Sequence, residues 1–215
     1  MHAALADPAR LAITDALTLG DASPSELQML LDMPSNLMAH HLKVLETAGL
    51  LARTRSEADR RRTYLTLVPG ALAGVDVGAA TSAPRVVFVC TANSARSQLA
   101  AALWRRASRV PVTSAGTHPA TRIDPGAVAV ARRRGVPMRV SRPRPLEEIV
   151  TAEDLIVTVC DNAHEELGTG ERSGRRGLHW SVRDPVSAGT ESAFDDTFTE
   201  LTRRVGDLAA RLRAS

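Results

Sequence analysis

The feature that most constrains the fold is a cysteine and an arginine separated by five small or polar residues. Cys90 and Arg96 enclose this loop. Residues 85–89 before it are apolar and rich in β-branched side chains, which predicts a strand, and residues 98–108 have a helical pattern. A strand, a tight loop and a helix N-terminus aim successive backbone N–H groups at one point, where the helix dipole adds positive charge. The sequence therefore predicts an oxyanion cradle.

Cys90 and Arg96 suit such a cradle chemically. The N–H groups that bind an anion also stabilise a thiolate, so we expect Cys90 to be ionised at neutral pH and nucleophilic. Arg96 offers a planar fork to two oxygens of a tetrahedral oxyanion. The alternative is a buried cysteine and a surface arginine at this spacing by chance. The strand before the loop and the helix after it favour the functional interpretation.

This loop resembles that of the low-molecular-weight protein tyrosine phosphatase superfamily, which includes the thiol-dependent arsenate reductases. Three later segments extend the resemblance, namely residues 112–116, 154–160 and 179–185, so that it covers residues 85 to about 213. It implies an α/β domain with an open parallel sheet of the low-molecular-weight phosphatase type. The loop residues that it implies as contacts of the substrate oxyanion are Thr91, Ala92, Asn93, Ser94, Ala95, Arg96 and Ser97.

The resemblance also implies catalytic roles. Cys90 attacks the central atom, Arg96 and the loop amides hold its oxygens, and Asp184 protonates the leaving oxygen. Cys160 matches the second redox cysteine of the reductases, which releases arsenite by forming a disulfide with the first. The alternatives are that Asp184 is an ordinary turn residue before Pro185 and that Cys160 is an inert, buried cysteine.

Two further residues of the loop have implied supporting roles. Ser97 is expected to donate a hydrogen bond to the thiolate, and Asn93 is expected to hold the strained shape of the loop. Both expectations come from the resemblance.

Phosphate and arsenate have nearly the same shape, so the loop does not choose between them. Val186 follows Asp184 and Pro185 where the phosphatases typically have tyrosine, and this favours a small inorganic oxyanion. Cys160 favours the reductase as well. We therefore expect a thiol-dependent arsenate reductase fused to a DNA-binding regulator. The alternatives are a low-molecular-weight phosphatase with a DNA-binding domain, and a repressor whose catalytic-like domain only senses ligand.

The reductant must come from outside the chain. Leu167 stands where the thioredoxin-coupled reductases carry a third cysteine, so a thioredoxin-like protein or a low-molecular-weight thiol such as mycothiol is expected as partner. Ala101 stands where reductases often have a glutamate in a potassium site, which argues against potassium dependence. We expect no bound cofactor and no metal site.

The N-terminal part has the pattern of a winged helix-turn-helix domain. Asp7-Pro8 and Ser23-Pro24 start two helices, residues 36–48 form a third, and residues 53–67 alternate as a hairpin does. Residues 36–51 and 5–11 resemble the ArsR family of bacterial repressors. The sequence departs from this family in two ways. First, Leu37 and Ala39 stand where the family often has hydroxyls that face DNA. Second, the second helix lacks the family's arsenite-sensing cysteines.

This resemblance implies a homodimer on double-stranded operator DNA. Adjacent histidines on a helix point about 100° apart, so a shared metal ion is not expected at residues 40–41. The hairpin tip is expected to contact phosphates. The residues that we expect on DNA are Ser35, Asn36, His40, His41, Lys43, Arg60, Arg61 and Arg62.

Composition supports two domains in a reducing compartment. Residues 69–84 are rich in Gly and Ala and predict a linker between domains at 1–68 and 85–215. Residues 1–84 carry two more acidic than basic residues, whereas residues 85–215 carry five more basic than acidic ones, which favours oxyanion capture there. Two cysteines do not make a disulfide framework, and no membrane span or export signal is visible, so we expect a cytoplasmic protein.

The second domain alternates strands and helices, which predicts a parallel sheet with helices on both faces. The expected strands are 85–90, 111–114, about 138–140, 154–159 and 177–180, and the expected helices are 97–108, 125–134, 145–150, 162–168 and 192–213.

Overall fold

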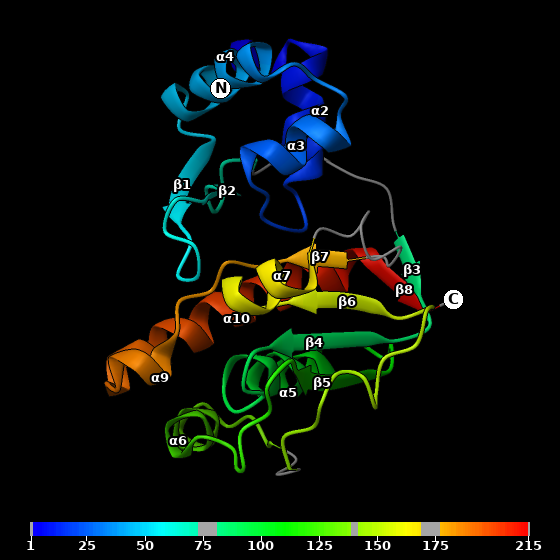
Figure 1. Ribbon diagram of the computed structural model, residues 1–215, viewed down its shortest axis with the longest axis vertical. Helices are drawn as coiled ribbons and strands as arrows, with labels where there is room; N and C mark the ends of the chain where they lie inside the picture. The colour runs from blue at the N-terminus through cyan, green and yellow to red at the C-terminus, as the bar shows by residue number, and fades with distance from the viewer. Residues whose placement is uncertain (1, 73–80, 139–141, 169–176, 215) are drawn as a thin grey trace. The chain divides into compact units, whose positions relative to one another are not determined.

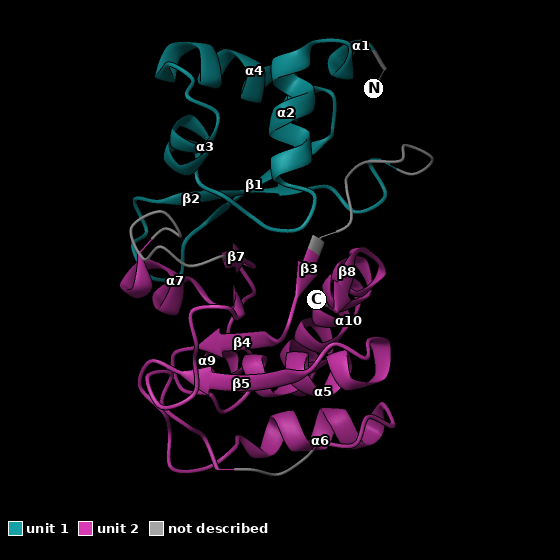
Figure 2. Ribbon diagram, turned by 90° about the vertical axis from the view of Figure 1, so that its right-hand side faces the viewer, with its two compact units in different colours: residues 1–79 teal, residues 80–215 magenta. Residues whose placement is uncertain are grey.

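The computed structural model describes the whole chain except residues 1, 73–80, 139–141, 169–176 and 215. The chain forms two compact units, residues 1–79 and 80–215 (Figure 2). Within the described ranges, the search for a helix with the length and apolarity of a membrane span finds no candidate.

The first unit is a winged helix-turn-helix, as predicted. Its elements are α1 (His2–Leu5), α2 (Pro8–Ala16), α3 (Pro24–Leu30), α4 (Ser35–Thr47), β1 (Leu51–Arg55) and β2 (Thr63–Leu67). The predicted starts of α2 and α3 are capped by side chains. The Asp7 side chain accepts a hydrogen bond from the Arg10 N–H, and Ser23 and Glu26 form a reciprocal capping box. Helix α1 was not predicted.

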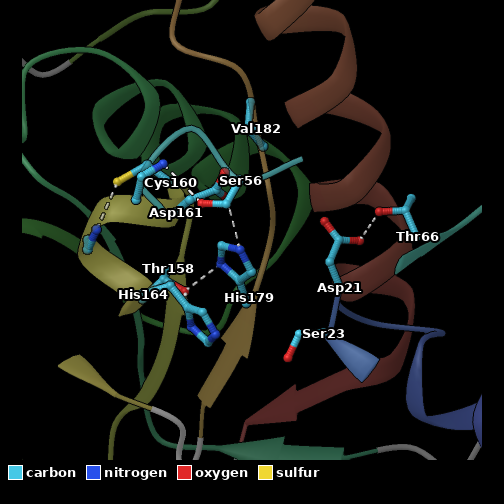
Figure 3. Close-up of polar contacts among 12 residues, drawn as sticks. Asp21, Ser23, Ser56, Thr66, Thr158, Cys160, Asp161, His164, His179 and Val182 are labelled. Carbon is cyan, nitrogen blue, oxygen red and sulfur yellow. Dashed lines mark hydrogen bonds and ion pairs between the residues drawn. The ribbon is translucent and has the colours of Figure 1, made fainter. Parts of the chain in front are cut away.

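A small apolar core holds this unit together. Ile13, Leu27, Met38 and Leu45 are fully buried. The two strands pair antiparallel with Leu51 opposite Leu67. The hairpin is tied to the segment between α2 and α3, because the Thr66 hydroxyl donates to an Asp21 carboxylate oxygen at 2.6 Å (Figure 3). The β1–β2 hairpin is therefore attached to the helices of its own unit.

The second unit is built on a four-stranded parallel sheet with the order β5-β4-β6-β7 (Figure 1). The strands are β4 (Val86–Cys90), β5 (Val112–Gly116), β6 (Leu155–Thr158) and β7 (Gly177–His179), and the helices are α5 (Arg96–Ala107), α6 (Pro125–Arg133), α7 (Asp161–Leu167), α9 (Pro185–Ala188) and α10 (Glu191–Arg211). Every residue of β4 is buried. This confirms the predicted α/β fold class and places the end of β4 where open parallel sheets form their sites.

Three details differ from the expectations. Residues 145–150 form a bridge and a turn and not a helix, because the first two of these residues extend the sheet edge. The Gly116 N–H donates to the Arg144 carbonyl and the Leu146 N–H donates to the Gly116 carbonyl, both at 2.9 Å. Within the expected linker, β3 (Thr81–Ala83) pairs in parallel with β8 (Leu212–Ala214). The expected strand at 138–140 falls mostly outside the described residues.

Candidate active site

The loop between β4 and α5 holds the Cys90 sulfur against a hydroxyl group. Cys90 Sγ lies 3.0 Å from Ser97 Oγ, and both residues are buried. The Asn93 side-chain amide donates to the same Ser97 oxygen at 2.9 Å. Since that oxygen already accepts a hydrogen bond, its own proton is available to the sulfur. Ser97 is thus placed to donate a hydrogen bond to the Cys90 sulfur.

Asn93 has a left-handed backbone conformation, with φ of 48°. Its side-chain oxygen accepts from the Arg144 N–H at 3.0 Å and from the Gln98 amide at 3.2 Å, and Gln98 also donates to the Asn93 carbonyl at 3.1 Å. These bonds offset the cost of a non-glycine residue in this region.

Gly116 on β5 lies directly against the loop. A Cβ atom there would stand 2.6 Å from the Thr91 carbonyl oxygen and 3.0 Å from the Asn93 nitrogen. The loop can approach the sheet this closely only because the residue has no side chain. Gln98, Gly116 and Arg144 were not predicted as site residues. Gln98 follows the motif directly and could have been considered, whereas the other two come close only through the fold.

The loop carbonyls turn toward the segment that follows β5. The carbonyls of Cys90, Thr91, Ala92 and Ser94 accept hydrogen bonds at 2.8–3.2 Å from backbone N–H groups within residues 117–124. In a trans peptide unit the N–H points away from the C=O. The N–H groups of the four residues that follow these carbonyls therefore point to the opposite side, where an oxyanion can accept from them.

Arg96 and Asp184 lie side by side. Arg96 is 7% exposed, and its Nη1 donates to the Val182 carbonyl at 2.9 Å. Its Nη2 lies 3.3 Å from Asp184 Oδ1. Asp184 caps α9, since its side chain accepts from the Val186 N–H at 3.2 Å, and 30% of its side chain is exposed. The structure thus brings a partly exposed carboxyl group to the arginine of the loop.

Cys160 lies beside the same loop. It is the N-cap of α7, where its sulfur accepts from the Ala163 N–H at 3.5 Å, and it contacts the Thr91 hydroxyl at 3.5 Å. Burial raises the pKa of the Cys160 thiol, and the negative charge of Cys90 raises it further. Both cysteines are free thiols. The second cysteine is therefore close to the first and is held in its protonated form while Cys90 is charged.

The first unit presents most of the expected DNA-contacting residues at its surface. Ser35, Asn36, His40 and Lys43 are exposed on α4. Arg60, Arg61 and Arg62 are exposed between β1 and β2.

The expectation for His41 is wrong, because this residue is buried, 6% exposed, with its Nδ1 3.9 Å from Asp7 Oδ1. The helical spacing of Met38, His41, Leu42 and Leu45 puts all four on the core side of α4. His41 therefore does not belong to the exposed surface of this helix.

One arginine at the hairpin tip is partly neutralised. Arg61 forms hydrogen bonds at 3.0 and 3.1 Å to the Asp59 carboxylate, which lower the pKa of Asp59 and raise that of Arg61.

Across the ranges that the structure describes, no three His, Cys, Asp or Glu side chains converge as metal ligands.

The fold and the loop define an α/β protein with a Cys-x5-Arg oxyanion site. Comparison with known families gives the more particular assignment. The profile described as low molecular weight phosphotyrosine protein phosphatase matches residues 85–215, and a helix-turn-helix domain profile matches residues 5–54. The chain therefore belongs to the low molecular weight phosphotyrosine protein phosphatase family and carries a helix-turn-helix domain before it.

Individual relatives are similar over the second unit. An arsenate reductase of Brevibacillus brevis is 30% identical over 131 residues, which is 60% of this chain and 90% of that protein. A glutaredoxin arsenate reductase of a Synechocystis species is 28% identical over 134 residues, or 60% of this chain and 98% of that protein. The crystal structure of an arsenate reductase from Archaeoglobus fulgidus superposes with a TM-score of 0.51 at 29% identity, covering 58% of this chain and 98% of that one.

Proposed function

We propose that the chain is a bifunctional arsenic-resistance protein, in which a thiol-dependent arsenate reductase is fused to an ArsR-like DNA-binding regulator. The observation that carries the reductase is the position of Cys160 beside the Cys90 loop. A phosphatase completes its cycle with water and one cysteine, whereas a reductase must deliver two electrons. The similarity to proteins named arsenate reductases supports the same choice.

In the first step, the Cys90 thiolate attacks the arsenic atom of arsenate. The loop N–H groups that point away from residues 117–124 and Arg96 hold the oxygens that gain negative charge. Asp184 protonates the departing oxygen, which leaves as water. A Cys90–arsenic bond results, and arsenic is still in its pentavalent state.

In the second step, Cys160 attacks the Cys90 sulfur. The sulfur–arsenic bond breaks and its electron pair stays on arsenic, so arsenite leaves and a Cys90–Cys160 disulfide forms. Cys160 must lose its proton before this attack, because the thiolate and not the thiol is the nucleophile. Burial raises the pKa of the Cys160 thiol, and Arg96 lowers it.

In the third step, the disulfide must be reduced from outside. The chain has two cysteines, and Leu167 on α7 occupies the position of a third one. A thioredoxin-like protein or a low-molecular-weight thiol such as mycothiol would then attack the disulfide. The relative named a glutaredoxin arsenate reductase fits an external thiol reductant.

For the first unit, we propose operator binding as a homodimer. Ser35, Asn36, His40 and Lys43 of α4 would enter the major groove, and residues 60–62 would contact phosphates. We take residues 1–68 as the DNA-binding domain and residues 80–215 as the catalytic domain, since β3, which lies inside the expected linker at 69–84, pairs with β8 of the second unit.

A single-turnover experiment tests the reductase. The reduced protein, mixed with one equivalent of arsenate, should release arsenite and show a Cys90–Cys160 disulfide by mass spectrometry. Cys160→Ser should release no arsenite in this experiment, yet it should still hydrolyse p-nitrophenyl phosphate. Hydrolysis of p-nitrophenyl phosphate with no arsenite from the unmodified protein would favour the phosphatase. If the protein showed neither activity but bound DNA in an oxyanion-dependent way, the result would favour a repressor whose catalytic-like domain only senses ligand.

A further inference from the structure

A polar cluster that the proposed mechanism does not use lies next to Cys160 (Figure 3). His179 Nε2 is 3.1 Å from Asp161 Oδ1, and both side chains are buried. His179 Nδ1 is 3.0 Å from the Thr158 hydroxyl oxygen, which also lies 3.3 Å from His164 Nδ1. The His164 and His179 rings are stacked, with centroids 4.0 Å apart.

The cluster includes residues that precede and follow Cys160 in the chain. Thr158 ends β6 and precedes Cys160 by two residues, and Asp161 begins α7 directly after it. His179 is the last residue of β7, the neighbouring strand. One imidazole therefore links β7 to the residues that flank the second cysteine.

Helix capping does not explain why this contact is buried. An acidic residue in the first turn of a helix is favourable when it is exposed to water. Burying the Asp161 carboxylate removes it from water, which is unfavourable unless a partner replaces the lost hydrogen bonds. His179 supplies such a partner. The arrangement makes the start of α7 depend on β7.

We propose that His179 is a positioning residue for the disulfide step. This inference rests on the proposed reductase function. By holding Thr158 and Asp161, His179 fixes the backbone of Cys160, so that the thiol stays at the Thr91 hydroxyl, beside the Cys90 loop. The step itself is the one described above. Cys160 loses its proton to solvent and bonds to Cys90, arsenic keeps the electron pair, and both sulfurs are oxidised by one electron each.

Disulfide formation is sensitive to this backbone position. Two cysteines bridge only when their Cβ atoms lie about 3.5–4.5 Å apart with a dihedral angle near 90°. A displacement of about 1 Å in a reacting group can slow a reaction about 100-fold. Attack of Cys90 on a phosphate ester, in contrast, involves no atom of α7. The two reactions of the same loop therefore distinguish positioning of Cys160 from general damage to the site.

The test compares these two reactions in His179→Gln. Disulfide formation is measured in single turnover with arsenate, by alkylation of free thiols and mass spectrometry at timed intervals. We expect it to slow by about tenfold or more, the size of effect expected from loss of a buried hydrogen bond to a charged group. Hydrolysis of p-nitrophenyl phosphate should stay within about twofold of the unmodified protein.

Two further variants make the result specific. Asp161→Asn has the same shape and keeps a weaker hydrogen-bond acceptor, so it should slow the same step by a smaller factor. Glu166→Gln is the matched control, since Glu166 is also a carboxylate of α7 that pairs with a histidine, His118 at 2.8 Å, but this pair is exposed and lies at the other end of the helix. It should change neither rate.

Disulfide formation at the unmodified rate in both His179→Gln and Asp161→Asn would overturn the inference. An equal fall of both reactions would also overturn it, because His179 would then support the whole site. If the unmodified protein itself released arsenite without a Cys90–Cys160 disulfide, or released no arsenite, the proposed function would fail first and the inference with it.

Discussion

Replacing Gly116 by alanine should disturb the oxyanion loop at Thr91 and Asn93. The added Cβ would meet the Thr91 carbonyl oxygen at 2.6 Å and the Asn93 nitrogen at 3.0 Å. Ordinary contact begins at 3.4 Å, so the loop would have to move by most of an ångström. That carbonyl also accepts the His118 N–H at 2.8 Å, which limits the direction in which the loop can move.

Forcing a group into a packed site costs about 1–3 kcal/mol. If most of this appears as lost anion binding, the dissociation constant for phosphate should rise about 5–150-fold, because 1.4 kcal/mol corresponds to a factor of ten. Isothermal titration with phosphate measures the binding, and thermal unfolding measures the effect on stability. Turnover of arsenate should fall in parallel, since the same N–H groups hold arsenate.

Gly177→Ala is the matched control, because Gly177 also lies in a strand of this sheet and its Cβ would come no closer than 3.7 Å to another atom. It should bind phosphate nearly as the unmodified protein does. Phosphate binding by Gly116→Ala at the unmodified affinity would refute the argument that close approach of β5 shapes the loop.

Other perturbations test the remaining parts of the proposal. Cys90→Ser should abolish both arsenate reduction and hydrolysis of p-nitrophenyl phosphate while leaving thermal unfolding nearly unchanged; residual turnover near the unmodified rate would exclude Cys90 as nucleophile. Asp184→Asn should slow turnover by about 10²–10⁴, the usual contribution of a general acid, and an unchanged rate would exclude this role. Because burial raises the pKa of the Cys160 thiol, single-turnover disulfide formation should accelerate as the pH rises through and above the ordinary range of a cysteine thiol; a rate independent of pH from 6 to 9 would contradict it. Removing the arginines at 60–62 together should weaken binding to all DNA sequences about equally and flatten the salt dependence, as measured by fluorescence anisotropy; unchanged salt dependence would mean that the hairpin does not contact phosphates.

The sequence predicts the parts of the site that depend on neighbouring residues in the chain. A strand, five loop residues and a helix start are contiguous, so the cradle around Cys90 follows from local order. Contacts between distant segments are different. Gly116 and Arg144 reach the loop only because β5 pairs with β4 and residues 144–146 extend the edge of β5. The His179–Asp161 contact likewise depends on the pairing of β6 with β7.

The errors have physical causes as well. His41 was expected on DNA because it matches the ArsR pattern together with His40 and Lys43, but the core side of α4 takes positions 38, 41, 42 and 45. Residues 145–150 were expected to be helical, yet the Leu146 N–H donates to the Gly116 carbonyl at the sheet edge, and only a single turn follows, in which the Ile149 and Val150 N–H groups donate to the Leu146 carbonyl. In both cases tertiary packing decides which face or which backbone partner a residue has, and local propensity does not contain that information.

Thr91 connects the loop of Cys90 with the second cysteine. The carbonyl before Thr91 is bonded to the segment after β5, which turns the Thr91 N–H toward the anion side of the loop. The Thr91 hydroxyl contacts the Cys160 sulfur at 3.5 Å. In the proposed mechanism, a single residue thus takes part in the cradle for the oxyanion and in the location of the second thiol. Hydrolysis of a phosphate ester does not require this second contact, because water ends that reaction. Reduction does require it, since the sulfur that accepts the bond from Cys90 must already be near when arsenic has been bound.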